Sequence, residues 1–266
     1  MSRLLAPAKL NLALVVGPKR RDGKHEVATV LQRITLADTL ALEPAPELQI
    51  EGFPEDKLVT SALESFAHRI PAVPRWRVTI EKNIPVAAGL GGGSSDAAAA
   101  LKLANAALDE PLTGGDLHQI AAELGADVPF FLTSGPQLGE GDGTELTLLD
   151  LPQDYWIVVV DPSGEQKEST AGVYKAFDRR EGELGFEERR AALHEALIRG
   201  DLAALPPNDL ASSPLAGELL ERGAFRADVT GAGPAVYGLF VEEEKAATAR
   251  AALSSYGEVW IAGPAW

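Results

Sequence analysis

Residues 85–101 have the sequence PVAAGLGGGSSDAAAAL, and this run of small residues decides how the rest of the chain is interpreted. Its four glycines lose conformational entropy on folding and add no side chain to a core. A strand is predicted just before it, at 75–85, and an alanine-rich helix is predicted from Ser94 or Ser95. A glycine-rich turn between a strand and a helix presents backbone N–H groups at the positive end of the helix dipole. This arrangement favours an anion such as phosphate.

Three other patterns produce glycine runs, and each fits less well. A Walker-type loop needs a lysine after the last glycine, and none follows here. The dinucleotide-binding fingerprint G-x-G-x-x-G requires a last glycine that this run lacks, and it follows the first strand of its unit, which this run does not. Close packing through small residues explains Ala97–Ala100 but not three consecutive glycines ahead of a helix. In an anion loop, the hydroxyls of Ser94 and Ser95 would cap the helix or bind phosphate or phosphate-bound Mg²⁺.

Length and composition limit the class of protein. The 266 residues are enough for one large core or for two domains side by side, and 45% hydrophobic with 24% charged residues is ordinary for a globular chain. No apolar run approaches the length of a bilayer span, and the basic residues follow the first apolar stretch rather than precede it, unlike a signal peptide. The absence of cysteine excludes disulfides and thiolate metal sites. We therefore expect a cytoplasmic protein without a membrane partner.

The net charge of −15 argues against nucleic acid as a partner, because that binding needs clustered cations. A small anionic ligand remains compatible if cations are concentrated locally. The first 35 residues contain such a concentration, which is either a chance surface patch or part of an anion site. Its members are Arg3, Lys9, Lys19, Arg20, Arg21, Lys24 and Arg33. The sequence does not give the oligomeric state.

Hydrophobic periodicity predicts strands and helices in two lobes. The first strand is expected at 8–17, and two more are expected to meet at Ala37-Asp38 after a turn at Asp22-Gly23. A buried strand at 154–162 opens the second lobe, so the domain boundary is expected near residue 150. Helices are expected at 56–70, ending against Pro71, and at 112–124, 169–178, 186–204 and 242–255. Further strands are expected at 226–230, 234–241 and 258–263.

Three motifs in the chain resemble those of the GHMP kinases, in the same order. Pro85–Ser95 resembles the phosphate loop of that family, PAKLNLALVV at 7–16 its first motif, and VTGAGPAVYG at 229–238 its third, glycine-rich motif. The resemblance covers essentially the full length. It implies an α+β fold of two lobes: 1–150 is a ribosomal-protein-S5-like, ATP-binding lobe with a left-handed crossover, and 151–266 is a ferredoxin-like, substrate-side lobe.

The resemblance further implies that the γ-phosphoryl group of ATP is transferred to an alcohol. Mg²⁺ is expected to arrive on ATP and to be held mostly by phosphate oxygens and water, because no His/Asp/Glu set has metal-ligand spacing. GEGDGTE at 139–145 lacks the ligand pattern of a calcium loop and predicts a solvated hairpin. The residues that would bind ATP are Pro85, Gly89, Leu90, Gly91, Gly92, Gly93, Ser94 and Ser95.

Two charged residues are candidates for catalysis. Asp127, in GADVPFF, stands among apolar residues, where a carboxylate is costly unless it is paired. It either caps a helix or accepts hydrogen bonds from backbone donors, or it is the base that takes the hydroxyl proton. Lys9 lies in an apolar strand, which indicates either an edge position with the ammonium reaching solvent or a buried partner for Asp127. The family resemblance favours the catalytic role for both residues.

PAKLNL, DG-x-HE, GLGGGSSDAAA and GADVPFF together resemble one subgroup of the family, whose substrate is an alcohol that carries cytidine diphosphate. The resemblance implies that Asn11 and His25 hold the substrate, with His25 bonding the cytosine. Thr170 and Tyr174, in STAGVYKAF, are the further expected substrate contacts, with Tyr174 as an aromatic wall beside the base. Lys24 stands where the subgroup has a second stacking tyrosine, which bears on cytosine affinity more than on phosphoryl transfer.

The third motif also departs from the family at Ala232 and Pro234, where the family has a small hydroxyl residue and a small residue. Thr230 could offer its hydroxyl to a ligand or bond its own backbone. The segment Asn208-Asp209-Leu210 is expected to be structural. Two alternative functions remain open: a kinase of the same family that acts on another small alcohol, and a non-catalytic member that binds ATP.

Overall fold

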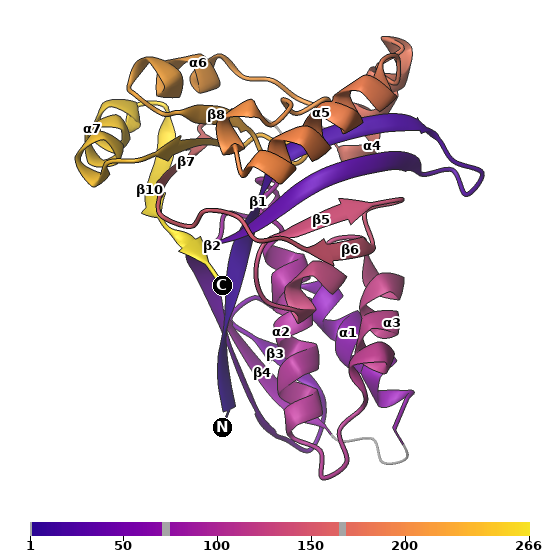
Figure 1. Cartoon of the computed structure of the whole chain (residues 1–266). Coiled ribbons are helices and arrows are strands. Elements are labelled where there is room, and N and C mark those ends of the chain that lie inside the picture. Colours follow the sequence, from indigo (N-terminus) through magenta and orange to yellow (C-terminus); the bar gives the residue numbers. More distant parts are fainter. Residues whose placement is uncertain (1, 71–74, 165–168) are drawn as a thin grey trace. The chain divides into compact units, whose positions relative to one another are not determined.

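A computed structural model describes residues 2–70, 75–164 and 169–266. It contains helices and two sheets, so the α+β prediction is confirmed (Figure 1). The chain forms two compact units that draw on interleaved segments. The first comprises 1–8, 36–86 and 91–134, and the second comprises 9–35, 87–90 and 135–266.

We expected a single boundary near residue 150, whereas these units interleave. The reason lies in the first two strands, β1 (Ser2–Lys19) and β2 (His25–Pro44), which are long enough to supply residues to both units. The roles predicted for 1–150 and 151–266 stay predictions.

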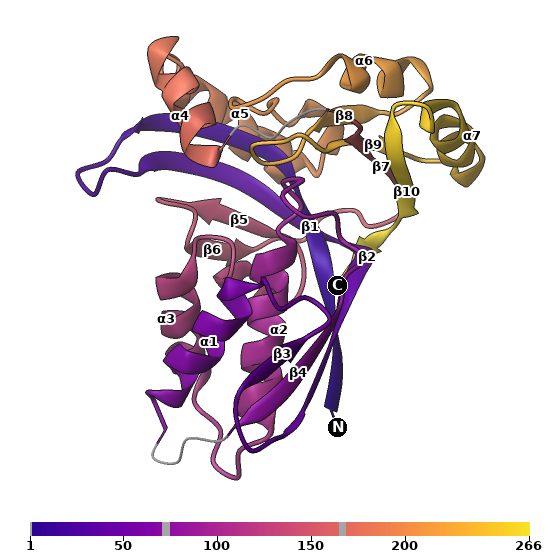
Figure 2. The ribbon, with the colours of Figure 1, turned by 180° about the vertical axis from the view of Figure 1, so that it is seen from behind.

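The first unit packs helices beside a small sheet. Residues 39–44 of β2 pair with the antiparallel β4, which pairs in parallel with β3. Helix α1 packs on α2 and α3, and the three lie side by side in both ribbon views (Figures 1 and 2). Phe66 of α1 contacts Trp76 of β4 at 6.0 Å between ring centroids. The elements that follow β2 in this unit are β3 (Gln49–Glu51), α1 (Lys57–Ala67), β4 (Trp76–Glu81), α2 (Gly92–Ala106), α3 (Gly114–Leu124) and the 3₁₀ helix η1 (Pro129–Leu132).

Helix starts in this unit follow capping signals in the sequence. Asp56 accepts hydrogen bonds from the backbone N–H groups of Leu58 and Val59 at the start of α1. Thr113 and Asp116 form a reciprocal capping box at the start of α3. Helix α1 ends at Ala67; Pro71, against which we expected it to end, lies outside the described residues.

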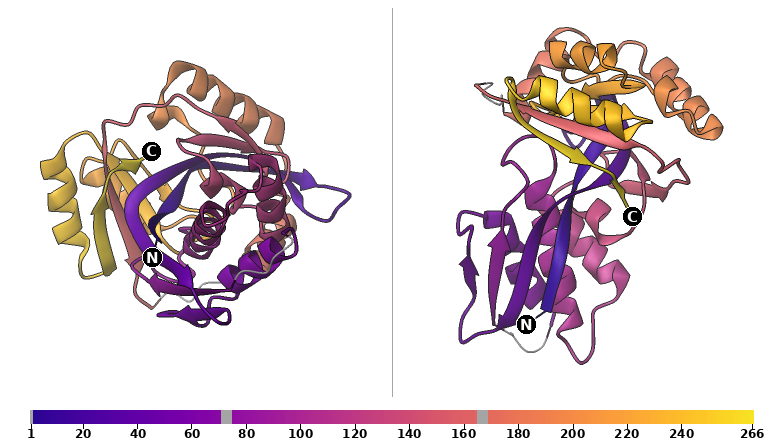
Figure 3. Two further views of the ribbon diagram at one scale, coloured as in Figure 1. Left: turned by 90° about the horizontal axis from the view of Figure 1, so that it is seen from below. Right: turned by 90° about the vertical axis from the view of Figure 1, so that its left-hand side faces the viewer.

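The second unit contains a four-stranded antiparallel sheet in the order β10-β7-β9-β8. Residues 29–31 of β2 pair with β5, which forms a hairpin with β6, and β11 pairs with β2 at residues 33–34. Helix α7 packs on β7 and β10 (Figure 3). The elements are β5 (Gln137–Glu140), β6 (Glu145–Leu148), β7 (Trp156–Pro162), α4 (Thr170–Arg179), α5 (Phe186–Arg199), η2 (Leu202–Ala204), α6 (Pro214–Glu221), β8 (Arg226–Val229), β9 (Val236–Phe240), α7 (Glu243–Leu253), β10 (Gly257–Ala262) and β11 (Pro264–Ala265).

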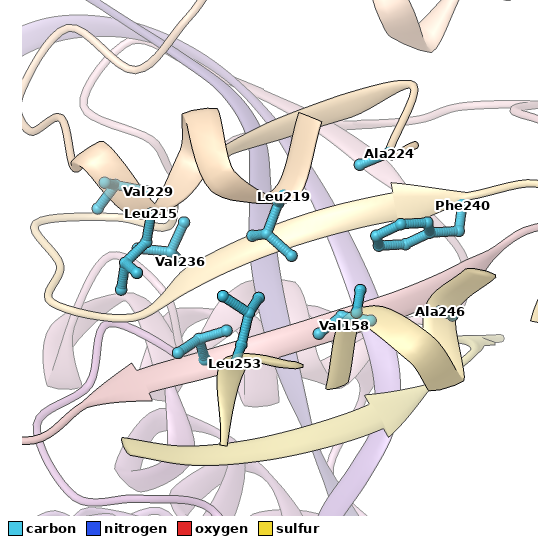
Figure 4. Packing of buried hydrophobic residues seen from close by; sticks show 11 residues of the cluster. Val158, Leu215, Leu219, Ala224, Val229, Val236, Phe240, Ala246 and Leu253 are labelled. Atoms are coloured by element: carbon cyan, nitrogen blue, oxygen red, sulfur yellow. The ribbon is translucent and has the colours of Figure 1, made fainter. Parts of the chain in front are cut away.

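The core of this sheet lies between its strands and helices α6 and α7 (Figure 4). Leu219 and Leu253 point from the two helices toward Val158, Val236 and Phe240 of the sheet, and all five are buried. Such residues each contribute about 1.5–3 kcal/mol of burial free energy. The strands expected at 154–162 and 234–241 are thus confirmed as the central strands of this sheet, β7 and β9.

Several predicted boundaries differ from the structure; the helix expected at 186–204, for example, ends at Arg199. The two strands expected to meet at Ala37-Asp38 are the single strand β2, because Asp38 is fully buried and bonded rather than exposed in a turn. Helix α2 begins at Gly92, not at Ser94 or Ser95. Helix α6 and the short strands β3, β5, β6 and β11 were not predicted, although β5 and β6 form the hairpin expected around 139–145. None of the helices in the described ranges could span a bilayer.

Candidate functional site

The glycine loop adopts a left-handed backbone at three positions, Ala87 (φ 64°), Gly89 (φ 87°) and Gly91 (φ 70°). Gly91 is the N-cap of α2, and no side chain caps this helix. The backbone N–H of Ser95 donates to the carbonyl of Gly91 at 2.9 Å, which is the first helical bond. The amides of 92–94 precede that bond and so have no helical acceptor. This helix start therefore presents donors that suit an anion.

The two serines lie inside the first turn of α2, so neither is the predicted helix cap. Ser94 is partly exposed, whereas Ser95 is buried, and its hydroxyl has no hydrogen-bond partner among the described residues. A buried hydroxyl without a partner carries a desolvation cost that a bound phosphate oxygen or Mg²⁺ would remove. The loop residues thus fit an ATP phosphate group with its ion.

In the second unit, residues 87–90 pack against the third predicted motif. A Cβ on Gly89 would collide with the backbone carbonyl of Thr230, so only glycine fits there. The backbone N–H of Ala235 donates to the carbonyl of Ala88 at 3.1 Å, and that of Lys9 donates to the carbonyl of Leu90 at 2.9 Å. The backbone of the glycine loop is therefore hydrogen-bonded to both the first and the third motif, although the three are far apart in the sequence.

Lys9 and Asn11 lie on the same face of β1, two residues apart. Lys9 is only 3% exposed, which excludes the alternative of an ammonium that reaches solvent. Its Nζ donates to Oδ1 of Asn11 at 2.5 Å, and Nδ2 of Asn11 donates to the hydroxyl of Thr29 at 2.8 Å. The hydroxyl of Thr230 accepts the backbone N–H of Asn11 at 3.0 Å. These bonds fix a buried cation beside the turn at Gly231, where an added Cβ would lie 3.3 Å from Nζ.

A buried charge cluster that the sequence analysis missed lies under the start of α2. Nζ of Lys82 donates to Oδ2 of Asp38 at 2.5 Å and to Oδ2 of Asp96 at 2.8 Å. Asp38 also accepts the backbone N–H groups of Asn83 and Ile84. Both carboxylates are fully buried, and a Cβ on Gly92 would lie 3.4 Å from Nζ of Lys82. The lysine thus ties β2 and α2 together directly beside the glycine loop.

Burial raises the pKa of Asp96 to about 7, and the nearby Asp38 charge adds to this, while the Lys82 hydrogen bond opposes it. Burial lowers the pKa of Lys82, but the hydrogen bonds to Asp38 and Asp96 outweigh it, so that pKa is raised. One ammonium facing two carboxylates is neutral overall when Asp96 carries a proton. Oδ1 of Asp96 has no partner among the described residues.

Asp127 lies in the turn between α3 and η1 of the first unit. It is partly buried, and it does not cap η1, whose N-cap is Val128 with no side-chain cap. Lys9 belongs to the second unit. The Lys9–Asp127 pair therefore stays a prediction.

The predicted substrate residues His25 and Tyr174 are brought together in the second unit. Their rings stack with centroids 4.9 Å apart and planes 27° apart. Phe177 meets the imidazole edge-on at 5.9 Å, and Asp178 Oδ1 lies 2.6 Å from Nε2. Phe177 and Asp178 were not predicted as site residues, although their spacing of three and four residues from Tyr174 places them on the same helix face.

Thr170 and Lys24 lie at exposed positions. Thr170 is the first residue of α4 and lies one turn before Tyr174. Lys24, in place of a stacking tyrosine, directs its Nζ to Oδ2 of Asp142 at 2.5 Å. Burial raises the pKa of Asp142, but hydrogen bonds from Lys24 and Thr144 outweigh it and bring the value to about 2. Arg20 likewise pairs with Glu26, so these members of the basic stretch are already neutralised.

The model for the GHMP kinase N-terminal domain matches residues 57–135, and that for the C-terminal domain matches 210–259. A 4-diphosphocytidyl-2-C-methyl-D-erythritol kinase of Moorella thermoacetica is 39% identical over 92% of this chain and 93% of its own length. The chain belongs to the GHMP kinase family. A kinase of the same description from Geobacter sulfurreducens is 37% identical to this GHMP kinase over 97% of the chain and 96% of its own length.

Solved structures give this GHMP kinase the fold of its family. A crystal structure of 4-(cytidine 5'-diphospho)-2C-methyl-D-erythritol kinase matches with a TM-score of 0.84 and 33% identity, covering 100% of both chains. A mevalonate kinase of Methanococcus jannaschii matches with a TM-score of 0.75, 16% identity and coverage of 100% of this chain and 98% of its own. The second likeness concerns the fold alone.

Proposed function

We propose that this GHMP kinase transfers the γ-phosphoryl group of ATP to the 2-hydroxyl of 4-diphosphocytidyl-2-C-methyl-D-erythritol, a step of the non-mevalonate route to isoprenoid precursors. The observation that carries the proposal is the group of relatives with that description, at 36–39% identity over 92–98% of this chain. Two built features support it: an uncapped, glycine-rich helix start for phosphates, and an ordered His25–Tyr174 pair for a base.

Phosphoryl transfer requires mainly positioning and charge stabilisation from the protein. In the proposal the substrate oxygen attacks the γ-phosphorus, its proton passes to the Asp127 carboxylate, and ADP leaves. Lys9 supplies the cation near the accepting hydroxyl; its burial and its 2.5 Å bond to Asn11 support this role, because a desolvated ammonium interacts more strongly than one in water.

Mg²⁺ carried by ATP is part of the proposal. Within 2–70, 75–164 and 169–266, no group of three or more His, Cys, Asp or Glu could hold a metal ion, so phosphate oxygens and water would supply most ligands. The Ser95 hydroxyl is the protein oxygen proposed to join them. When bound, the ion would neutralise charge on the phosphates.

A coupled ADP-release assay tests the function directly. We expect rapid ADP release with the diphosphocytidyl alcohol, little with mevalonate or homoserine, and ³¹P NMR of the product showing one new phosphomonoester at the 2-position. Faster turnover of another alcohol would identify a different kinase of the family. Nucleotide binding without ADP release for any of the three would indicate a non-catalytic member.

A further inference from the structure

His25 is held by three side chains of one helix. Tyr174 stacks on the imidazole, Phe177 meets its edge, and Asp178 contacts Nε2. These positions of α4 are separated by three and four residues, so one helix face supplies all three contacts. The imidazole side chain is only 7% exposed. The ring is therefore fixed in orientation.

The Asp178 carboxylate decides which ring nitrogen carries a proton. An ionised carboxylate only accepts hydrogen bonds, so the nitrogen at 2.6 Å from Oδ1 must be the donor. In a neutral imidazole the other nitrogen is then an acceptor. Among the described residues the His25 ring forms its hydrogen bond at Nε2, and Nδ1 has no partner, so the Nδ1 lone pair is available to a ligand.

We propose that Asp178 is a positioning residue that favours cytosine over uracil by keeping His25 in the Nε2-protonated tautomer. The inference rests on the proposed function, in which His25 bonds the pyrimidine. At its 4-position cytosine carries an amino donor, whereas uracil carries a carbonyl acceptor. The Nδ1 lone pair accepts from the amino group. Against uracil two acceptors would face each other, which costs more than a missing contact.

Kinetics with two substrates test the role of Asp178. The substrates are 4-diphosphocytidyl-2-C-methyl-D-erythritol and its uridine diphosphate counterpart. We expect Asp178→Ala to raise KM for the cytidine substrate about tenfold and to leave kcat within about twofold, so that the kcat/KM preference over the uridine substrate falls about tenfold. Asp178→Asn, whose amide offers both a donor and an acceptor, should give an intermediate preference. Asp154→Asn removes an exposed charge in the same unit, and it should change neither KM for the cytidine substrate nor the preference over the uridine substrate.

Nitrogen-15 NMR provides a readout that a purely structural role would not move. The chain has four histidines, so the His25 signals can be assigned with a His25→Gln variant. We expect a proton on Nε2 alone in the wild type and a mixture of tautomers in Asp178→Ala. A wild-type ring protonated on Nδ1, or an unchanged base preference in Asp178→Ala, would overturn the inference.

A purely structural role of Asp178 and a failure of the proposed function would each give a result different from the expected one. A structural role alone would lower the thermal unfolding temperature of Asp178→Ala and weaken both substrates equally, which also contradicts the inference. Failure of the proposed function would appear earlier, as a wild-type enzyme that does not turn over the cytidine substrate, and the inference would fail with it.

Discussion

The side-chain Nδ2 of Asn208 donates a hydrogen bond of 2.7 Å to the backbone carbonyl of Gly231. The same nitrogen donates to the carbonyl of Val229 at 2.9 Å, and Oδ1 accepts the backbone N–H of Leu210 at 2.8 Å. Asn208 is buried. The Asn208 side chain thus holds the backbone on both sides of Thr230. Thr230 in turn contacts Gly89 through its carbonyl and accepts a hydrogen bond from Asn11 through its hydroxyl.

We expect Asn208→Ala to destabilise the protein by about 1–3 kcal/mol, because buried backbone groups lose their partners. The turn should also shift, so kcat should fall as the surroundings of Lys9 change. Thermal unfolding and steady-state kinetics measure both effects. Asn105→Ala is the matched control: Asn105 bonds both backbone groups of Leu112 in the first unit, and its loss should cost stability but not kcat. Equal kinetic effects of the two variants would contradict a specific role for Asn208.

Gly89 and Gly93 are two glycines of the loop for which we expect different roles, Gly89 in packing and Gly93 in ligand binding. Gly89→Ala places a Cβ against the carbonyl of Thr230 at a left-handed residue. We expect it to cost about 1–3 kcal/mol or more from strain alone and to lower the yield of folded protein. Circular dichroism during heating measures the loss. An unfolding temperature equal to that of the wild type would contradict the close contact between Gly89 and the carbonyl of Thr230.

Gly93 lies within α2, and a Cβ there would meet nothing within 4 Å. Gly93→Ala should therefore stabilise the helix by about 0.5–1 kcal/mol and, by filling space proposed for phosphate, raise KM for ATP about tenfold. Gly217→Ala in α6 is the matched control, because its Cβ also meets nothing. It should stabilise without changing KM. If KM for ATP were unaffected in Gly93→Ala, the phosphates would have to lie elsewhere.

Lys9→Ala and Asp127→Ala test the proposed catalytic pair. Each should lower kcat by about 10²–10⁴-fold, the range for loss of a general acid or base, while ATP still binds. Isothermal titration with a non-hydrolysable ATP analogue measures the binding, and ADP release measures kcat. Lys245→Ala serves as a control, since Lys245 is exposed and pairs with Glu242 at the surface beside the start of α7. Near-normal turnover in either variant would remove that residue from the mechanism.

Local sequence signals predicted the elements of this fold that depend on local physics. Asp56, Thr113 and Ser169 cap helices where the sequence has short polar side chains ahead of amphipathic segments. The run WIVVV became a central strand because its residues 157–160 are buried on both faces. The glycine loop was predicted from its run of small residues between an expected strand and an expected helix, and it lies between β4 and α2 as expected.

The remaining features depend on residues that are distant in sequence. Asp38 looked like part of a turn because nothing nearby indicates that Lys82 and the amides of 83–84 satisfy its carboxylate. His25 and Asp178 are 153 residues apart, so their contact has no local signal. Helix α2 starts before the serines because Gly91 adopts a left-handed cap, which serine propensity does not report.

The Asp38–Lys82–Asp96 cluster makes stability depend on pH in a direction opposite to that of most carboxylates. Burial raises the pKa of Asp96 from 3.8 to about 7. Between these values the folded state keeps a proton that the unfolded state has released, so stability falls as pH rises from about 4 to about 7 and levels off above that range. The group thus stabilises the folded protein most fully in acid.

Asp96→Asn should remove this dependence, since an amide keeps an acceptor for Lys82 and carries no titrating proton. We expect the unfolding free energy of the wild type to fall more steeply than that of the variant between pH 5 and pH 8, as measured by urea unfolding. Asp109→Asn, at an exposed carboxylate of the same unit, should follow the wild-type slope. Parallel slopes for the wild type and Asp96→Asn would mean that Asp96 is ionised in the folded protein throughout this range, with the cluster carrying a net negative charge beneath the loop.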